Sequence, residues 1–345
     1  MKNKPVSIRN IADELKISVT TVSFVLNGKA KEKHISETLT QKVLDYAKLI
    51  NYKPNQIAQS LRTGKSKILV FMVEDISNSF FSKLARILED IAYKKGYRLI
   101  FCSNENDDDK SKELIELFNF RQVDGFIIVP SPGIRHIIRN LIEENIPVVL
   151  LDRFFDGLDC NCVVIDNEEA SFSASEELIK NGFRNIAFIT MASSQTQMKD
   201  RLLGYEKAIA NHGLKSKVLE IPYNEISNGK GIEYLKDYLK NHSDLDAIFF
   251  ATNYLAQNGL QVFKELDSNL LTDLGIMTFD DNDMFKIYPT SISCIAQPLN
   301  EISANVMELI LPLLNGKDIK KMPQKIVLKS EIILRESSSR KFKTK

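Results

Sequence analysis

The sequence predicts an α/β protein: a two-lobed body of parallel sheets preceded by a small all-α helix-turn-helix domain. Short helical patterns fill residues 1–53, and apolar runs of strand length alternate with amphipathic stretches from residue 67 onward. A chain of 345 residues is also too long for one ordinary core, so two or three domains are expected.

The first 53 residues predict three short helices. Ser7 is placed to cap a first helix, whose apolar positions follow helical spacing at Ile8, Ile11, Ala12 and Leu15. A turn then leads to Ser18, which is placed to cap a second helix over about 19–26 that ends at Asn27-Gly28. Ser36 precedes a third helix with one apolar side: Leu39, Val43, Ala47 and Ile50. This order predicts a helix-turn-helix, whose second helix lies in the major groove of DNA.

The second helix carries small polar residues that a core does not need. Val22 and Leu26, with Leu15, could form a buried stripe. We expect the remaining residues to face DNA, with Val19, Thr20 and Phe24 toward the bases and with Thr21 and Ser23 available to phosphates or caps. A phenylalanine offers only apolar contact, best met by a thymine methyl group. The alternative is that Phe24 packs back on the third helix.

Residues 54–66 connect the two parts and are expected to form a hinge helix and linker. The segment PNQIAQSLRTG opens with Pro54 and closes with Gly64, the asymmetry expected of a short helix. About two turns are too few for stability in water. Two alternatives stay open: a helix that folds only against a partner, and a plain linker.

The body alternates strands with helices, which predicts parallel sheets covered on both faces. Helices are expected near 80–95 and 111–121, and the number of strands suits two similar lobes. The expected strands lie at 68–73, 97–101, 123–129, 146–151, 163–166, 186–190, 246–251 and 274–279. Ligands of such folds bind at the carboxyl ends of the strands, here between the lobes.

The net charge of +1 is divided unequally along the chain. Residues 1–67 hold 13 Lys and Arg against 5 Asp and Glu, a charge of +8, whereas the remaining 278 residues carry −7. A small basic part on an acidic body predicts that the basic part meets a polyanion and that the body does not.

Composition also bears on the compartment. The longest apolar runs are far shorter than a membrane span, and no apolar segment of a secretory signal follows the basic start, so we expect a cytoplasmic protein without a membrane partner. The four cysteines suit a reducing compartment: Cys102, Cys160, Cys162 and Cys294. Cys160 and Cys162 form a lone C-x-C without further ligands nearby, so we expect buried thiols and no metal site.

No motif of a known catalytic apparatus is present. The 14 glycines build no G-x-G-x-x-G, G-x-S-x-G and H-E-x-x-H are absent, and the four histidines are scattered. The Gly64-Lys65-Ser66 triplet lacks the earlier glycine of a phosphate-binding loop. These absences do not exclude catalysis, but they leave no residue to name as a nucleophile or base, and we expect no catalytic residue, no cofactor and no enzyme activity.

Recognition groups follow the predicted strands instead. Aromatic faces with carboxylate, guanidinium and amide groups suit a polyhydroxyl ligand, because each hydroxyl both donates and accepts. The groups are those of Phe80, Phe81, Asp152, Arg201, Asn253 and Asp280. Taken singly, each could be an aromatic core residue, a strand-end cap or a surface ion pair; their shared place at strand ends favours a binding site.

Motifs at both ends of the first 64 residues and along the body resemble those of a known family. SIRNIADELKISVTTVSFVLNG at 7–28 and NYKPNQIAQSLRTG at 51–64 are similar to the DNA-binding module of the lac repressor family of bacterial transcription regulators. The body continues the resemblance over nearly the whole chain, through DISNSFF at 75, VDGFIIV at 123, PVVLLDR at 147, VVIDN at 163, RLLGY at 201, FDD at 279 and IAQP at 295.

The resemblance implies a homodimer that binds a near-palindromic double-stranded operator, most often as a repressor. It implies a periplasmic-binding-protein-like body that takes a small effector, commonly a sugar, and a hinge helix that inserts a leucine into the minor groove, here Leu61. The residues expected to contact DNA are Ser18, Val19, Thr20, Thr21, Ser23, Phe24, Asn27, Asn55, Leu61 and Arg62. Those expected at the effector are Phe80, Phe81, Asp152, Arg201, Asn253 and Asp280.

The expected boundaries are 1–53 for DNA binding, 54–66 for the hinge and linker, 67–338 for effector binding and dimerisation, and 339–345 for a basic tail without a leucine heptad. The family often has arginine at the position of Phe24, proline at Ser79, aspartate at Tyr254 and glycine at Thr278. These departures concern the base preference and the effector. A sugar-binding transport protein shares the two-lobed body and is the rival interpretation, but it has no use for a +8 helical segment.

Overall fold

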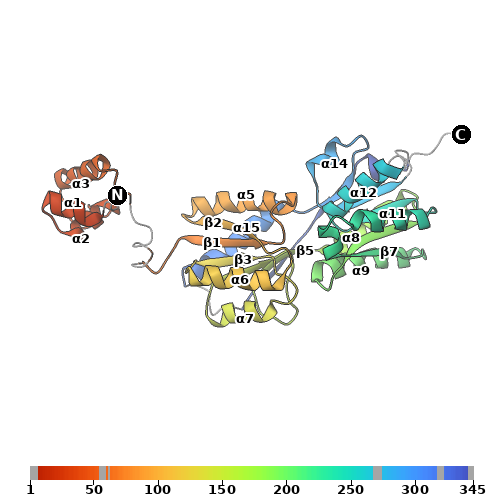
Figure 1. Cartoon of the computed structure of the whole chain (residues 1–345), viewed down its shortest axis with the longest axis horizontal. Coiled ribbons are helices and arrows are strands. Elements are labelled where there is room, and N and C mark those ends of the chain that lie inside the picture. The colour runs from red at the N-terminus through yellow and green to blue at the C-terminus, as the bar shows by residue number, and fades with distance from the viewer. Residues whose placement is uncertain (1–6, 54–59, 61–62, 267–273, 317–321, 341–345) are drawn as a thin grey trace. The chain divides into compact units, whose positions relative to one another are not determined.

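The computed structural model describes residues 7–53, 60, 63–266, 274–316 and 322–340 (Figure 1). The chain forms two compact units, Met1–Ser66 and Lys67–Lys345. We refer to them as the N-terminal unit and the body.

The N-terminal unit contains the three expected helices: α1 (Ile8–Leu15), α2 (Val19–Leu26) and α3 (Glu37–Leu49). Their cores meet in one cluster of buried side chains: Ile11, Ala12, Val22, Val25, Val43 and Ala47. The expected apolar stripe was wrong in one detail, because Val25 is buried and Leu26 only partly so. The helix starts are satisfied locally: the Ser18 hydroxyl accepts the Thr21 N–H at 3.0 Å, and the Ser36 hydroxyl accepts the Leu39 N–H at 3.3 Å.

The first lobe of the body is built on a parallel sheet in the order β11-β5-β4-β3-β1-β2. Its strands are β1 (Ile68–Val73), β2 (Arg98–Ser103), β3 (Gly125–Ile128), β4 (Val148–Leu151), β5 (Cys162–Ile165) and β11 (Lys325–Leu328). Side chains of β1 alternate between two clusters. One of these clusters includes α5 (Ser79–Lys94) and α15 (Leu299–Leu314), and the other includes α6 (Asp108–Phe120) and α7 (Arg135–Glu143). Helices therefore cover both faces of the sheet (Figure 1).

The second lobe repeats this plan in the order β12-β10-β9-β8-β6-β7. Its strands are β6 (Ile186–Ala192), β7 (Lys217–Pro222), β8 (Ala247–Phe250), β9 (Gly275–Phe279), β10 (Ser293–Ala296) and β12 (Glu331–Ile333). All neighbours are parallel except β10 and β12, which pair antiparallel. Its helices are α8 (Asn167–Lys180), α9 (Thr196–Asn211), α10 (Tyr223–Ser227), α11 (Gly231–Asn241), α12 (Asn253–Leu266) and α14 (Asp283–Ile287), followed late in the chain by the 3-10 turn η1 (Glu336–Ser338).

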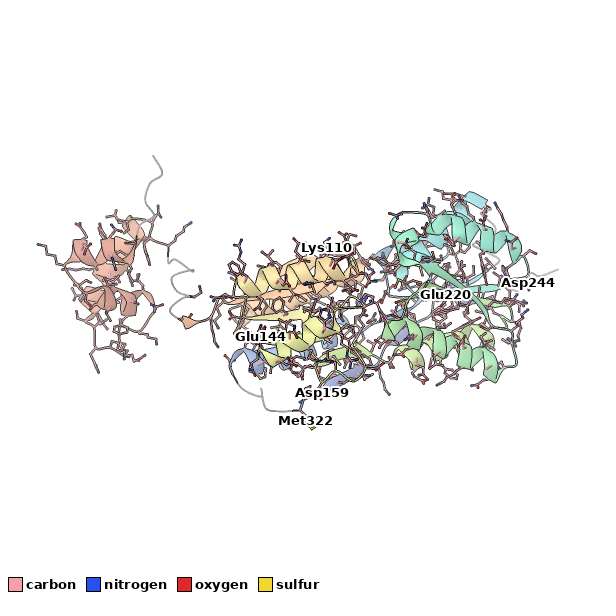
Figure 2. The ribbon with its side chains drawn as sticks, turned by 60° about the horizontal axis from the view of Figure 1, so that its bottom comes forward. Lys110, Glu144, Asp159, Glu220, Asp244 and Met322 are labelled. Atoms are coloured by element: carbon pink, nitrogen blue, oxygen red, sulfur yellow. The ribbon has the colours of Figure 1, made fainter. Side chains whose placement is uncertain are left out.

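The two lobes are continuous through the chain, which passes between them after β5, after β10 and between β11 and β12. Apolar side chains fill the layers between helices and sheets in each lobe, while Glu144 and Asp244, both labelled in Figure 2, are exposed. In Figure 2 these two side chains lie in different lobes, at opposite ends of the body. The predicted class, a helical N-terminal unit followed by two parallel α/β sheets, is confirmed.

Gly204 lies where α9 crosses α8 at close range. A methyl group at this position would meet the carbonyl oxygen of Glu168 far inside contact distance and the Cβ of Ser171 at 2.8 Å. These are backbone and short side-chain atoms that cannot swing away.

We therefore expect Gly204→Ala to lower the free energy of unfolding of the body by about 1–3 kcal/mol or more, through overpacking. Urea unfolding followed by circular dichroism measures it. Gly231→Ala is the matched control, because a methyl group there meets its nearest neighbour at 3.4 Å, an ordinary contact. Equal effects of the two changes would contradict the close approach of α8 and α9.

Candidate functional site

The exposed side of α2 divides into residues that cap the helix and residues that do not. The hydroxyls of Ser18 and Thr21 lie 2.8 Å apart, and the Asn27 amide donates to the Ser23 carbonyl oxygen at 2.7 Å. Val19 and Thr20 are exposed, and Val19 keeps 40% of its surface. The helix thus presents an uncommitted surface of small side chains on its first turn.

Phe24 is half-buried, and its place bears on the two alternatives for it. The partly buried apolar residues packed against the core of the described N-terminal unit are Ile8, Leu15, Ile17, Leu26, Ala30, Ile35, Leu39, Tyr46, Ile50 and Tyr52. Phe24 is not among them, and the ammonium group of Lys33 lies 5.5 Å from the centre of its ring. This arrangement favours a ring at the edge of the surface over a ring in the core.

Positive charge surrounds this helix. Lys16 precedes it, and Lys29, Lys31 and Lys33 follow it, all exposed. Exposed ammonium groups beside a protruding helix suit contacts with phosphate groups, which position a protein on DNA. Three further residues expected at DNA, Asn55, Leu61 and Arg62, lie outside the described residues.

In the body, five of the six expected ligand residues line one cavity between the lobes. Phe80, Phe81, Asp152, Arg201 and Asp280 share it with Glu74, Asn78, Arg153, Met191, Gln197, Met198, Thr252 and Tyr254. The sixth, Asn253, lines an adjoining cavity of about 320 Å³ instead. The expectation that strand ends would bring these side chains together is therefore met at the carboxyl edges of both sheets.

The two aspartates occupy equivalent places in the two lobes. Asp152 follows β4 and Asp280 follows β9, which are the fourth strands from the β2 and β7 edges of their sheets. Both have φ of 68°, in the left-handed region that glycine adopts most easily. Such a conformation persists only when the surroundings hold it, and it is common at ligand sites. Here it directs a carboxylate from each lobe into the same cavity.

Arg201 on α9 is fixed by the second lobe. Its Nε donates to Asn167 Oδ1 and its Nη1 to the Ala251 carbonyl oxygen, each at 2.8 Å, and its guanidinium lies 3.9 Å from the centre of the Phe279 ring. Only 2% of the residue is exposed. Asn167 was not predicted as a site residue; its place directly after β5 is the signal that could have found it.

Asp280 is held by Gln297, whose amide donates to it at 2.7 Å. Burial raises the pKa of this carboxyl above its ordinary value, and the Arg201 charge and the Gln297 hydrogen bond oppose that shift only in part. The native state therefore binds the Asp280 proton more tightly than the unfolded chain does. The stability that this protonation contributes falls as pH rises from the ordinary aspartate pKa through the raised pKa of Asp280.

Asp280→Asn should consequently raise the melting temperature at neutral pH, and this gain should shrink as pH falls toward 3.8, the ordinary value. Calorimetric melts over that pH range measure it. Asp283→Asn is the control of opposite sign, since hydrogen bonds from Lys286 and Lys83 lower the pKa of the exposed Asp283. A gain for Asp280→Asn that does not change with pH would contradict the buried, raised carboxyl.

Side chains from the two lobes meet directly at the cavity. The Asn253 amide donates to Asn78 Oδ1 at 2.9 Å, and the Asn282 amide donates to the Ser79 hydroxyl at 3.0 Å. On the other side, Gln195 Nε2 donates to Asn106 Oδ1 at 2.8 Å. Ser79 stands where the resembled family often has proline, and a proline could not accept this bond.

The space between the lobes at the shared cavity is small. The shared cavity has a volume of about 30 Å³, room for about two water molecules and far less than a sugar needs. Phe80 and Phe81 pack edge to face at 5.0 Å beside it. A ligand of sugar size therefore has to enlarge this cavity or extend into the adjoining cavities of about 320 and 310 Å³, which share lining residues with it.

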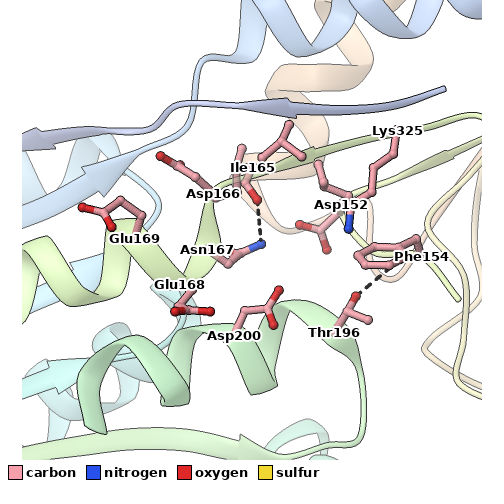
Figure 3. Close-up of a pocket in the computed structure, with 12 residues that line it drawn as sticks. Asp152, Phe154, Ile165, Asp166, Asn167, Glu168, Glu169, Thr196, Asp200 and Lys325 are labelled. Atoms are coloured by element: carbon pink, nitrogen blue, oxygen red, sulfur yellow. Dashed lines mark hydrogen bonds between the residues drawn. The ribbon is translucent and has the colours of Figure 1, made fainter. Parts of the chain in front are cut away.

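A third cavity, of about 310 Å³, shares Asp152 and lies where the chain crosses from β5 to α8 (Figure 3). Besides Asp152, its lining includes four acidic residues, Asp166, Glu168, Glu169 and Asp200, together with Lys325 of β11. Thr196 bridges the lobes here, because its hydroxyl accepts the Phe154 N–H at 3.4 Å (Figure 3).

Metal sites and membrane spans are absent from the part of the chain that the structure describes. Within the described residues, no group of three or more His, Cys, Asp or Glu is placed to hold a metal ion, and no helix is long and apolar enough to cross a membrane. Burial raises the pKa of the Cys160 thiol to about 12, which leaves it protonated and a poor metal ligand.

Two family descriptions match this chain. Residues 7–55 match "Bacterial regulatory proteins, lacI family", and residues 65–298 match "Periplasmic binding proteins and sugar binding domain of LacI family". A curated relative, the HTH-type transcriptional regulator RegA of Clostridium saccharobutylicum, is 31% identical over 335 residues, covering 96% of this chain and 99% of that protein.

Two solved structures extend the comparison. The lac repressor dimer bound to operator and the anti-inducer ONPF superposes with a TM-score of 0.84 at 19% identity, covering 98% of this chain and all of that one. A periplasmic binding protein/LacI transcriptional regulator from Alkaliphilus metalliredigens, complexed with D-xylulofuranose, gives 0.69 at 24% identity, covering 79% of this chain and 98% of that one. At these identities the likeness concerns the fold.

Proposed function

Since the chain belongs to the lacI family of bacterial regulatory proteins, we propose that it represses transcription as a homodimer on a near-palindromic operator, under the control of a sugar-like effector bound between the lobes. The family consists of DNA-binding transcription regulators, so the chain is one of these and not an enzyme. The observation that carries the finer proposal is the interlobe cavity that joins Asp152, Arg201 and Asp280 with two phenyl rings.

The parts take distinct roles in this proposal. Residues 1–53 bind operator DNA, 54–66 form the hinge, 67–338 bind effector and form the dimer, and 339–345 form a basic tail. On DNA, Val19, Thr20 and Phe24 face the bases, while Ser18, Thr21, Ser23 and Asn27 contact phosphates or cap α2. Asn55, Leu61 and Arg62 act from the hinge. A regulator with this task works in the cytoplasm, where the DNA is.

In this proposal, effector control follows from the small size of the cavity between the lobes. A cavity of about 30 Å³ has to enlarge before a sugar enters, so binding changes the hydrogen bonds that join the lobes near Ser79 and Asn106. An effector shifts an equilibrium only as far as its affinities for two states differ. The rearranged contacts supply such a difference, and the hinge would transmit it to the DNA-binding unit.

A selection from randomised DNA, followed by gel shifts with and without a panel of sugars, tests the proposal. We expect one inverted-repeat site, bound with an affinity that falls roughly a thousandfold between about 50 and about 200 mM salt, because several phosphates are neutralised. We also expect one sugar to change that affinity. The rival interpretation, a sugar-binding transport protein, predicts sugar binding without any selected DNA sequence.

A further inference from the structure

Glu74 and Arg153 form a buried ion pair on the wall of the effector cavity. Arg153 Nη2 lies 2.5 Å from Glu74 Oε2, and the two residues are only 3% and 7% exposed. Arg153 also donates to Asn106 Oδ1 at 2.9 Å, and its Nε lies 3.5 Å from an Asp152 oxygen. Neither residue was predicted as part of the site, and no role assigned so far uses the pair.

The positive charges of this cavity are already matched by negative ones. Its charged lining consists of the Arg153 and Arg201 guanidinium groups and the Glu74 and Asp152 carboxylates, and it also holds the Asp280 carboxyl, whose pKa burial raises. Burial alone would lower the pKa of Arg153, but the Glu74 and Asp152 carboxylates raise it, so this group stays charged. An anionic ligand would add a negative charge where both positive charges are already matched. A buried charge without a partner of opposite sign is strongly unfavourable.

The hydrogen-bonding needs of the cavity point the same way. Carboxylates only accept, and within the described residues the Gln197 Oε1 atom of this cavity is buried without a partner. The one unpartnered donor here is Arg153 Nε. A cavity rich in acceptors is matched by hydroxyl groups, which donate and accept, better than by the anionic oxygens of a phosphate or a carboxylate, which only accept.

We propose that Glu74 makes the effector site selective for uncharged polyhydroxyl molecules, by occupying Arg153 so that sugar phosphates and sugar acids are excluded. This inference rests on the proposed effector site. It names Glu74 as the residue that sets the charge of the ligand. Removing its charge without changing its shape should free Arg153, beside Arg201, to bind an anion.

The test uses inorganic phosphate as the probe on the full-length protein. Wild type should show no saturable thermal shift with phosphate beyond that in sodium chloride of equal ionic strength. Glu74→Gln should gain a saturable shift. Its apparent affinity for phosphate should lie about tenfold or more above the weakest affinity that the assay can measure for wild type. Adding Arg153→Gln to Glu74→Gln should abolish the gain. Asp75→Asn, a change at the neighbouring exposed carboxylate, should behave as wild type.

A second arm needs no variant. Wild type is screened with matched pairs, namely glucose and glucose 6-phosphate, ribose and ribose 5-phosphate, and glucose and glucuronate. Every compound that stabilises wild type should be the uncharged member of its pair. Saturable stabilisation of wild type by phosphate or by an anionic member would overturn the inference, as would a folded Glu74→Gln that gains nothing. Loss of the proposed function would show separately, as a wild-type protein that selects no DNA sequence.

Discussion

Arg201→Ala is expected to abolish the response of operator binding to the effector and also to lower the melting temperature of the body. The first effect follows because the guanidinium is a charged donor in the proposed ligand cavity. The second follows because the Asn167 side-chain oxygen and the Ala251 carbonyl oxygen lose their donors. Each buried acceptor left unpaired costs about 1–3 kcal/mol. Arg201 is therefore expected to have two tasks, binding the ligand and supporting the fold of the body.

Calorimetry with the sugar found in the screen and thermal melts separate these tasks. Glu206→Ala is the control, because Glu206 lies on the same helix but is exposed. The Arg201→Ala variant should keep its affinity for the operator, since the N-terminal unit has its own core. Unchanged sugar affinity in a protein that melts earlier would show that Arg201 only supports the fold.

Phe24→Arg is expected to change which base pair the second helix prefers. Phenylalanine can make only apolar contact, which favours the methyl group of thymine, whereas arginine can donate two hydrogen bonds to guanine. The preference at the facing base pair should move toward guanine by about 1–3 kcal/mol, roughly 5- to 150-fold. Selection from randomised half-sites, sequenced before and after enrichment, measures this change.

Val22→Ala is the matched control on the same helix. Val22 is fully buried in the helical core, so its truncation should lower the melting temperature without moving the base preference. The same outcome for Phe24→Arg would place Phe24 in the core and the base readout elsewhere on α2.

The elements that the sequence predicts well are those whose burial depends on local pattern. Apolar runs such as 68–73 are buried central strands, and the helix caps at Ser18 and Ser36 form within four residues of chain. Strand ends also locate most of the cavity, because parallel strands bring their carboxyl ends to one edge. This is why residues as distant as Phe80 and Asp280 could be expected together.

Four strands were not predicted: β7, β10, β11 and β12. β7 contains Lys217 and Glu220, β11 alternates exposed with partly buried residues, and β12 has no fully buried residue, as is common in edge strands. β10 contains a fully buried Ser293, whose hydroxyl is satisfied by Arg335 and Ser338 from more than 40 residues away. Such strands are stabilised by tertiary partners that no local pattern reveals.

The same reason hid the Glu74–Arg153 pair. The two residues are 79 positions apart, and each follows a strand that is itself an apolar run. Singly, either could have been an exposed charge. The two residues meet because β1 and β4 end at the same edge of one sheet, an arrangement that exists only in the folded chain.

The left-handed aspartates have a consequence for protein engineering. Glycine would suit the backbone at Asp152 and Asp280 better, since a non-glycine residue held there costs on the order of 1 kcal/mol. A design procedure that ranks substitutions by stability alone would therefore choose glycine at both positions and deliver a more stable protein that lacks both carboxylates of the proposed effector cavity. Anyone building a biosensor from this scaffold should fix these two positions first and seek robustness elsewhere, for instance on the exposed faces of the outer helices.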